Sequence, residues 1–273
     1  MLIAWVLALL INYVAREEKT IRGFLSMLMD GFGEGSLLFM AGIGSTTFNI
    51  VVWYLSSMLI SMAILYPLIR KYPNTMAKVV LPVAVILMLG YLYQNYGTLR
   101  SPTQWIGFTY KGNIRAISEI SLGVIGYEIV QYFSPVKLNR KGKAFLSVIK
   151  WGMYGAIIAY MWLRRGDRRD YIFLFMFWFA IMCSFSQKGI EKNFFQNKVC
   201  FFLGKFSLAI YLCHIFWAKN LNFLLPDIYG NAEKIGIYIV CSFLTAIVVM
   251  LVSTFLRKHI TSVKGRLKVF FEL

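Results

Sequence analysis

The residues best suited to chemistry are Ser207, Tyr211 and His214, which lie in the mostly apolar stretch 203–214. Their spacing of i, i+4 and i+7 places the three side chains on one face of a helix. Such a face can bind a polar substrate, and its imidazole titrates near neutral pH. The alternative is a hydrogen-bonded seam between helices, which serine and histidine also form in membranes. Both interpretations remain open at this point.

A second candidate is the pair Arg115 and Glu119, spaced i, i+4. Opposite charges at this spacing pair on a helix, and pairing lowers the cost of placing them in a membrane. The pair either lines a substrate cavity, with Arg115 contacting a carboxylate or phosphate, or is a structural ion pair near the helix end. Asn49, Trp53 and Ser56 have near-helical spacing and could line the same cavity. Trp53 has the alternative role of an interfacial anchor.

The composition indicates a membrane protein. Of the 273 residues, 59% are hydrophobic and 15% are charged, whereas a soluble domain carries about 25% charged residues. The net charge of +17 comes mainly from basic residues in short loops, where they orient helices and meet anionic lipid, so we expect no nucleic-acid partner. Neither the cysteines nor the two histidines have a metal-ligand spacing, so we expect no metal. We expect buried thiols at Cys183, Cys200, Cys213 and Cys241.

Apolar stretches long enough for membrane helices recur along the chain, at 48–69, 79–94, 114–134, 145–163, 171–187, 205–218 and 235–256. With residues 1–15, they predict an all-α fold, a polytopic transmembrane helical bundle with about eight membrane helices, in one domain over residues 1–273. A helix of residues 1–15 would rise only about 22 Å, short of the hydrocarbon core of about 30 Å. We therefore expect that sequence upstream is missing.

Other segments are expected at the membrane surface or only partly within it. Residues 20–31 show an amphipathic pattern suited to a surface helix, and 36–43 is a short, re-entrant candidate. Residues 257–273 are expected to form an amphipathic cytoplasmic tail. Lysine and arginine are more numerous on the loops that share a side with this tail, which places both termini in the cytoplasm. The basic loop 164–169 then lies outside, either to hold an anionic group or as a solvated turn.

Three stretches, taken in order, carry a family resemblance. The first is Asn49 to Ile60 followed by Tyr66-Pro67-Leu68, the second is Arg115 to Tyr127, and the third is Leu203 to His214. Together they resemble the integral-membrane acyltransferase family 3, from about residue 36 onward. Its members include O-acetyltransferases of surface polysaccharides and peptidoglycan.

The resemblance implies transfer of an acyl group such as acetyl from acyl-coenzyme A to a hydroxyl of a cell-surface glycan, at the cell membrane. It makes the following residues candidates for lining the substrate site: Arg115, Glu119, Ser207, Tyr211, His214, Asn49 and Trp53. Family members begin with a helix that carries an arginine–histidine pair taken to be catalytic. No histidine precedes His214 in this chain, so the catalytic residues stay unassigned. We expect the chain as written to transfer little acyl group, and His214 to serve acceptor binding or structure.

Two other functions remain open. A bundle of membrane helices with an intramembrane charge pair also suits a transporter or flippase for a lipid-linked sugar or acyl group, although no inverted repeat is visible. A non-catalytic membrane subunit of envelope glycan assembly is the other alternative, favoured by the missing histidine.

Overall fold

The computed structural model describes residues 2–14, 20–44, 48–163, 168–186, 197–224 and 230–271. The elements formed by these residues are helices, with one isolated bridge between Trp105 and Tyr110. The expected all-α membrane fold is confirmed. Among the described residues, 5 helices are long and apolar enough to cross a membrane: Val52–Lys71, Pro73–Tyr96, Arg140–Trp162, Lys198–Asn220 and Ala232–Arg257.

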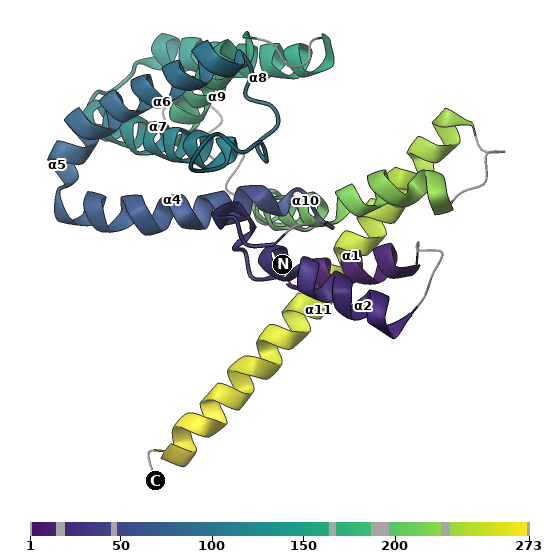
Figure 1. Cartoon of the computed structure of the whole chain (residues 1–273). Coiled ribbons are helices and arrows are strands. Elements are labelled where there is room, and N and C mark those ends of the chain that lie inside the picture. The colour runs from purple at the N-terminus through teal and green to yellow at the C-terminus, as the bar shows by residue number, and fades with distance from the viewer. Residues whose placement is uncertain are drawn as a thin grey trace. The chain divides into compact units, whose positions relative to one another are not determined.

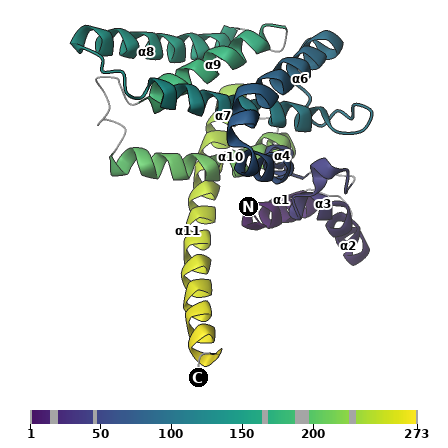
Figure 2. The ribbon, with the colours of Figure 1, turned by 90° about the vertical axis from the view of Figure 1, so that its left-hand side faces the viewer.

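The chain divides into two compact units, and the second comprises Met40–Gly42 with Trp53–Asn197. Its helices are α4 (Val52–Lys71), α5 (Pro73–Thr75), a π-helical turn (Met76–Val80), α6 (Leu81–Tyr96), α7 (Lys111–Phe133), α8 (Arg140–Leu163) and α9 (Asp170–Phe185). Helix α7 packs against α6 and α9, and α9 packs against α8, as the neighbouring ribbons in Figures 1 and 2 show.

A buried stripe on α6 accounts for the packing of α6 against α7. Leu81, Val85, Leu89 and Leu92 recur at helical spacing and are each at most 5% exposed. Leu122 of α7 packs in one core cluster with Val85, Leu89 and Leu92. Helix α6 then ends at Gly97, whose φ of 64° is a left-handed conformation that glycine adopts without strain. This turn directs the chain into the loop before α7.

The first unit comprises Met1–Phe39, Ile43–Val52 and Lys198–Leu273. It contains α1 (Leu2–Val14), α2 (Ile21–Asp30), α3 (Phe32–Gly35), α10 (Lys198–Leu224) and α11 (Asn231–Phe271). Helices α10 and α11 pack together, and α1 packs against both. Small residues form the α10–α11 seam, where Ala209 and Ala246 are buried beside Phe206. Such residues let membrane helices approach closely.

Several helix boundaries differ from those expected. Helix α10 begins at Lys198 where we expected 205, and α11 continues from the apolar span to Phe271 where we expected a separate helix after 257 (Figure 2). Within 36–43 the structure has only a short 3₁₀ turn, Phe39–Ala41. Helix α2 forms as expected, and its apolar residues Ile21 and Leu25 are exposed.

Candidate functional site

Arg115 and Glu119 form the expected ion pair on α7. Arg115 Nε lies 2.6 Å from Glu119 Oε1, with the side chains 28% and 20% exposed. Arg115 Nη1 also donates to the backbone carbonyl of Leu99 at 3.0 Å. The guanidinium lies 5.6 Å from the centre of the Trp53 ring, in cation–π geometry. The pairing is confirmed, while a role in substrate binding stays a prediction.

A network of buried polar groups fixes the first turn of α7, and with it the position of Arg115. Asn113 Nδ2 donates to the carbonyl of Met40 at 2.7 Å and to Thr109 Oγ1 at 2.8 Å. Asn113 Oδ1 accepts from Ser57 Oγ of α4 at 2.8 Å. A side chain at Gly112 would meet the carbonyl oxygen of Pro102. The start of α7 is therefore held to α4 and to the loop before α7.

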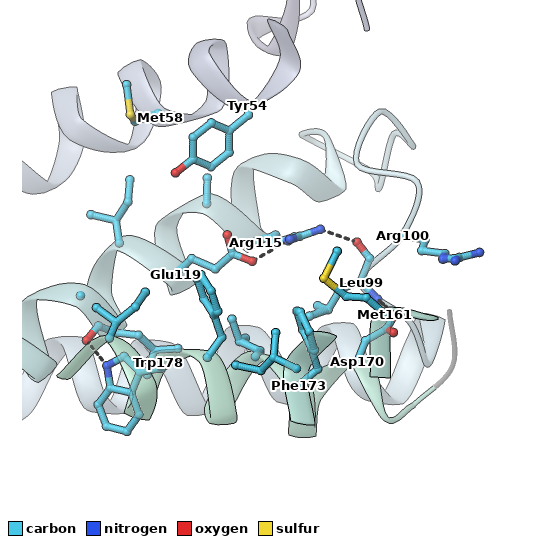
Figure 3. A pocket seen from close by; sticks show the side chains of 18 of the residues that line it. Tyr54, Met58, Leu99, Arg100, Arg115, Glu119, Met161, Asp170, Phe173 and Trp178 are labelled. Carbon is cyan, nitrogen blue, oxygen red and sulfur yellow. Dashed lines mark hydrogen bonds and ion pairs between the residues drawn. The ribbon is translucent and has the colours of Figure 1, made fainter. Parts of the chain in front are cut away.

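A cavity of about 1160 Å³ opens beside the ion pair. Its apolar walls come from four helices, with Met58 of α4, Ile120 of α7, Ile157 of α8 and Phe173 of α9 as examples. Trp178 Nε1 is hydrogen-bonded to the carbonyl of Leu122 at 2.6 Å. Figure 3 shows Trp178 towards one end of the cavity and Arg100, Arg115 and Asp170 towards the other.

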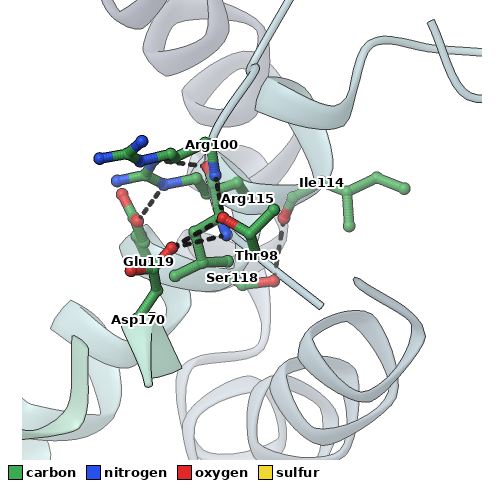
Figure 4. Close-up of polar contacts among 8 residues, drawn as sticks. Thr98, Arg100, Ile114, Arg115, Ser118, Glu119 and Asp170 are labelled. Atoms are coloured by element: carbon green, nitrogen blue, oxygen red, sulfur yellow. Dashed lines mark hydrogen bonds and ion pairs between the residues drawn. The ribbon is translucent and has the colours of Figure 1, made fainter. Parts of the chain in front are cut away.

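The charged end of the cavity joins segments that are far apart in the sequence. Asp170 Oδ2, at the start of α9, accepts from Thr98 Oγ1 at 2.8 Å and from the Leu99 N–H at 3.2 Å. Asp170 Oδ1 lies 3.4 Å from Tyr160 Oη of α8. Figure 4 shows Asp170 and Thr98 close to the Arg115–Glu119 pair, with Arg100 nearby. The sequence analysis missed Arg100 and Asp170, because their position depends on contacts between distant segments.

Asn49, Trp53 and Ser56, which were expected to line one cavity, are not among the residues that line this one, and Trp53 lies beside it through its contact with Arg115. Helix α4 begins at Val52, so Asn49 precedes it, and the assumed helical spacing is wrong for Asn49. Asn49 Nδ2 donates to the carbonyl of Leu212 on α10 at 2.7 Å. Ser56 is fully buried, and its Oγ accepts from the Met40 N–H at 3.0 Å. Both side chains thus have structural hydrogen bonds.

Ser207, Tyr211 and His214 all lie on α10, in the first unit. Ser207 is exposed and bonds to the carbonyl of Gly204 in its own helix at 2.8 Å. Tyr211 Oη donates to the carbonyl of Val51 at 2.9 Å. His214 Nδ1 lies 2.8 Å from the Tyr211 carbonyl and 3.2 Å from that of Ile210. Because a carbonyl only accepts, Nδ1 carries the proton and Nε2 of the neutral ring is an acceptor.

Glu34 of α3 is a buried carboxylate that the sequence analysis did not single out. It is 1% exposed and accepts from the backbone N–H groups of Phe48 at 2.7 Å and Asn49 at 2.5 Å. Burial raises the pKa of Glu34 above its ordinary value, although these two hydrogen bonds act in the opposite direction. Glu34 therefore fixes the segment that bonds to α10 through Asn49.

The sequence predicted no metal site and buried thiols at the four cysteines. The described residues contain no group of three or more His, Cys, Asp or Glu side chains that could hold a metal ion. Cys183 and Cys213 are buried, and Cys200 and Cys241 are partly buried.

In the basic loop, residues 164–167 lie outside the described residues. Arg168 packs its guanidinium 5.3 Å from the centre of the Tyr93 ring.

Comparison with known proteins identifies the family. The family model acyltransferase 3, described as an acyltransferase domain, matches residues 1–255. The match begins upstream of residue 36, where we expected the resemblance to start. No curated protein and no solved structure matches the chain. The chain belongs to the acyltransferase 3 family, and it is a membrane acyltransferase by family and by its apolar helices.

Proposed function

We propose that the protein transfers an acyl group, such as acetyl, from acyl-coenzyme A to a hydroxyl of a cell-surface glycan. Family membership supports acyl transfer, and the Arg115–Glu119 pair at the end of a large cavity is the observation that carries a substrate site. In this reaction the hydroxyl oxygen attacks the thioester carbonyl, the carbon–sulfur bond breaks, and coenzyme A leaves as a thiol after taking up the proton. A base must accept the hydroxyl proton, and hydrogen-bond donors must stabilise the oxyanion.

The candidate side chains Arg115, Glu119 and His214 differ in which of these steps they can perform. Arg115 is a permanent cation whose planar group recognises carboxylates, phosphates and oxyanions. The Glu119 carboxylate is already paired with Arg115, so we do not assign it as the base. We assign both residues to substrate binding. His214, in the other unit, has an Nε2 that can accept a hydrogen bond from a substrate hydroxyl. We assign His214 to acceptor binding and leave the catalytic base unassigned.

The test is acyl transfer in membranes that contain the full-length protein from its own host. The assay measures release of free coenzyme A together with the mass of the acylated sugar. Ser207→Ala, Tyr211→Phe and His214→Ala should reduce the rate unequally, with the histidine change largest. Removing one buried hydrogen bond from the transition state costs about 1–3 kcal/mol, or roughly five- to 150-fold in rate.

His259→Ala, which changes an exposed histidine of α11, is the matched control and should keep the parent rate. Equal rates for His214→Ala and the parent would remove His214 from acceptor binding. If no glycan supports coenzyme A release by the full-length protein, the acyltransfer proposal is wrong.

A further inference from the structure

Basic residues outnumber acidic residues in the region around the charged end of the cavity. Arg100 and Arg115 line the cavity, and Lys111 lies one turn before Arg115 with its Nζ 4.9 Å from the centre of the Tyr96 ring. Arg168 lies beside the loop that follows α6, since a Cβ atom at Gly97 would be 3.6 Å from the Arg168 side chain. Glu119 and Asp170 also line this end and balance Arg100 and Arg115, so the positive excess comes from Lys111 and Arg168, which lie outside the lining. The region is therefore complementary to an anionic group.

The remainder of the cavity is apolar and long. On α9 its lining runs from Asp170 to Ile181, which is about 16 Å along a helix and about half the thickness of a hydrocarbon core. The volume of about 1160 Å³ exceeds that of most small-molecule pockets, about 300–1,000 Å³. An acetyl group would fill only a small part of this space. An alkyl or prenyl chain fits its length and its apolar walls.

The end with the charges is also the end that the loop composition places outside. Arg100 and Lys111 belong to one of the predicted outer loops and 164–169 is another, and in the structure Asp170, which follows the second loop, accepts a hydrogen bond from Thr98 of the first. A lipid in the outer leaflet carries its headgroup at this level and its chain below it.

We infer that the glycan acceptor reaches this cavity attached to a lipid. The apolar chain occupies the space between α4, α7, α8 and α9, and the phosphate that links chain and sugar lies against Arg100 and Arg115. This inference rests on the proposed acyltransfer, since that reaction supplies the reason for a sugar on the lipid. It names the class of acceptor as a phosphate-linked glycolipid.

The experiment uses the full-length protein in phosphatidylcholine vesicles. The probe is a hexose joined by a phosphodiester to a prenyl chain that carries a photoreactive diazirine. After irradiation, mass spectrometry should locate the label on peptides of α4, α7 or α9. Gly123→Phe should abolish the labelling, because Gly123 lines the cavity and has no heavy atom within 4 Å of its Cβ position. Gly152→Phe, at a similarly open glycine of α8 away from this lining, should label like the parent.

The phosphate contact is tested separately. Arg100→Gln should reduce labelling by the phosphate probe about fivefold, the effect of one basic residue near an anionic lipid. Labelling by the matching uncharged prenyl probe should stay the same. Competition identifies the source of the anion, and neither phosphatidylglycerol nor inorganic phosphate should displace the probe as well as the unlabelled glycolipid does. Equal displacement by either of them would overturn the inference.

Acyl transfer to a water-soluble hexoside separates this inference from the proposed function. If the parent and Gly123→Phe acylate the hexoside equally and no lipid probe labels the cavity, the acyltransferase stands and the lipid-borne acceptor is wrong. If the probe labels the cavity but no acceptor releases coenzyme A, the acyltransfer proposal is wrong and the acceptor assignment falls with it.

Discussion

At the scale of single residues, Arg115 combines contacts that lysine could not reproduce. Its Nε pairs with Glu119, its Nη1 donates to the carbonyl of Leu99, and its face lies over Trp53. Only a planar group with several fixed donors can make these contacts together. Removing the arginine leaves a carboxylate in a largely apolar cavity, whereas removing both charges leaves no unpaired group.

Arg115→Ala should therefore lower stability, and the double variant with Glu119→Gln should recover part of the loss. Breaking a fully buried pair costs about 3–5 kcal/mol; because both side chains are about a quarter exposed, we expect about 1–3 kcal/mol. Thermal unfolding of the detergent-solubilised protein measures the change. Glu128→Gln, an exposed glutamate on the same helix, is the control. Unchanged unfolding temperatures for the single variants Arg115→Ala and Glu119→Gln would show that the pair is solvated.

Glu34 predicts a pH dependence of a definite sign. Burial raises the pKa of Glu34 above its ordinary value near 4.5, so the folded protein binds this proton more tightly than the unfolded chain. Stability from this group is present below the ordinary pKa and is lost as the pH rises through the raised pKa. Glu34→Gln removes the titrating group, but its amide nitrogen cannot accept the second backbone N–H, so this variant should be less stable than the parent in acid and should change less with pH.

The measurement is the unfolding temperature of both proteins from about pH 4.5 to about pH 7, where ordinary carboxyls become ionised. The parent should lose more stability than Glu34→Gln over this range, and Glu128→Gln should follow the parent. Parallel curves for Glu34→Gln and the parent would mean that the Glu34 proton does not contribute.

At the scale of the elements, local patterns predicted the helices better than their ends. Lys205 suggested the start of a helix, but its Nζ lies 4.4 Å from the centre of the Phe201 ring one turn earlier, and the helix continues through it. The Arg115–Glu119 pair was predictable because both residues lie on one helix. The cavity was not predictable, because it requires the Asp170–Thr98 contact, across 72 residues. Asn49 was misplaced because a turn precedes Val52.

The α10–α11 seam gives a prediction about packing. Ala246 is fully buried between α10 and α11, so Ala246→Phe should force the helices apart. Overpacking a core costs about 1–3 kcal/mol, which thermal unfolding and the yield of folded protein would detect. Leu244→Phe on the same helix is the control, since Leu244 is 58% exposed. Equal stability of the two variants would indicate that the seam is loosely packed.

At the scale of the whole molecule, the distribution of basic residues among the loops predicts the orientation in the membrane. In the proposed acyltransfer, a cytoplasmic acyl donor and an external acceptor meet across the membrane. The more basic loops are therefore expected on the donor side and the charged end of the cavity on the acceptor side. This orientation assigns 137–143 to the cytoplasm and the loop before α7 to the outside.

Single cysteines test this orientation after replacement of Cys183, Cys200, Cys213 and Cys241. Phe108→Cys places a thiol in the loop before α7 at a residue that is 82% exposed, and Lys141→Cys places one at an exposed position in the first turn of α8. In intact cells an impermeant maleimide should label Phe108→Cys and spare Lys141→Cys, because the bilayer excludes the reagent from the cytoplasm. Permeabilised cells are the control, and both thiols should react there. Labelling of Lys141→Cys alone in intact cells would reverse the orientation, place the charged end of the cavity on the donor side, and remove the external glycolipid from it.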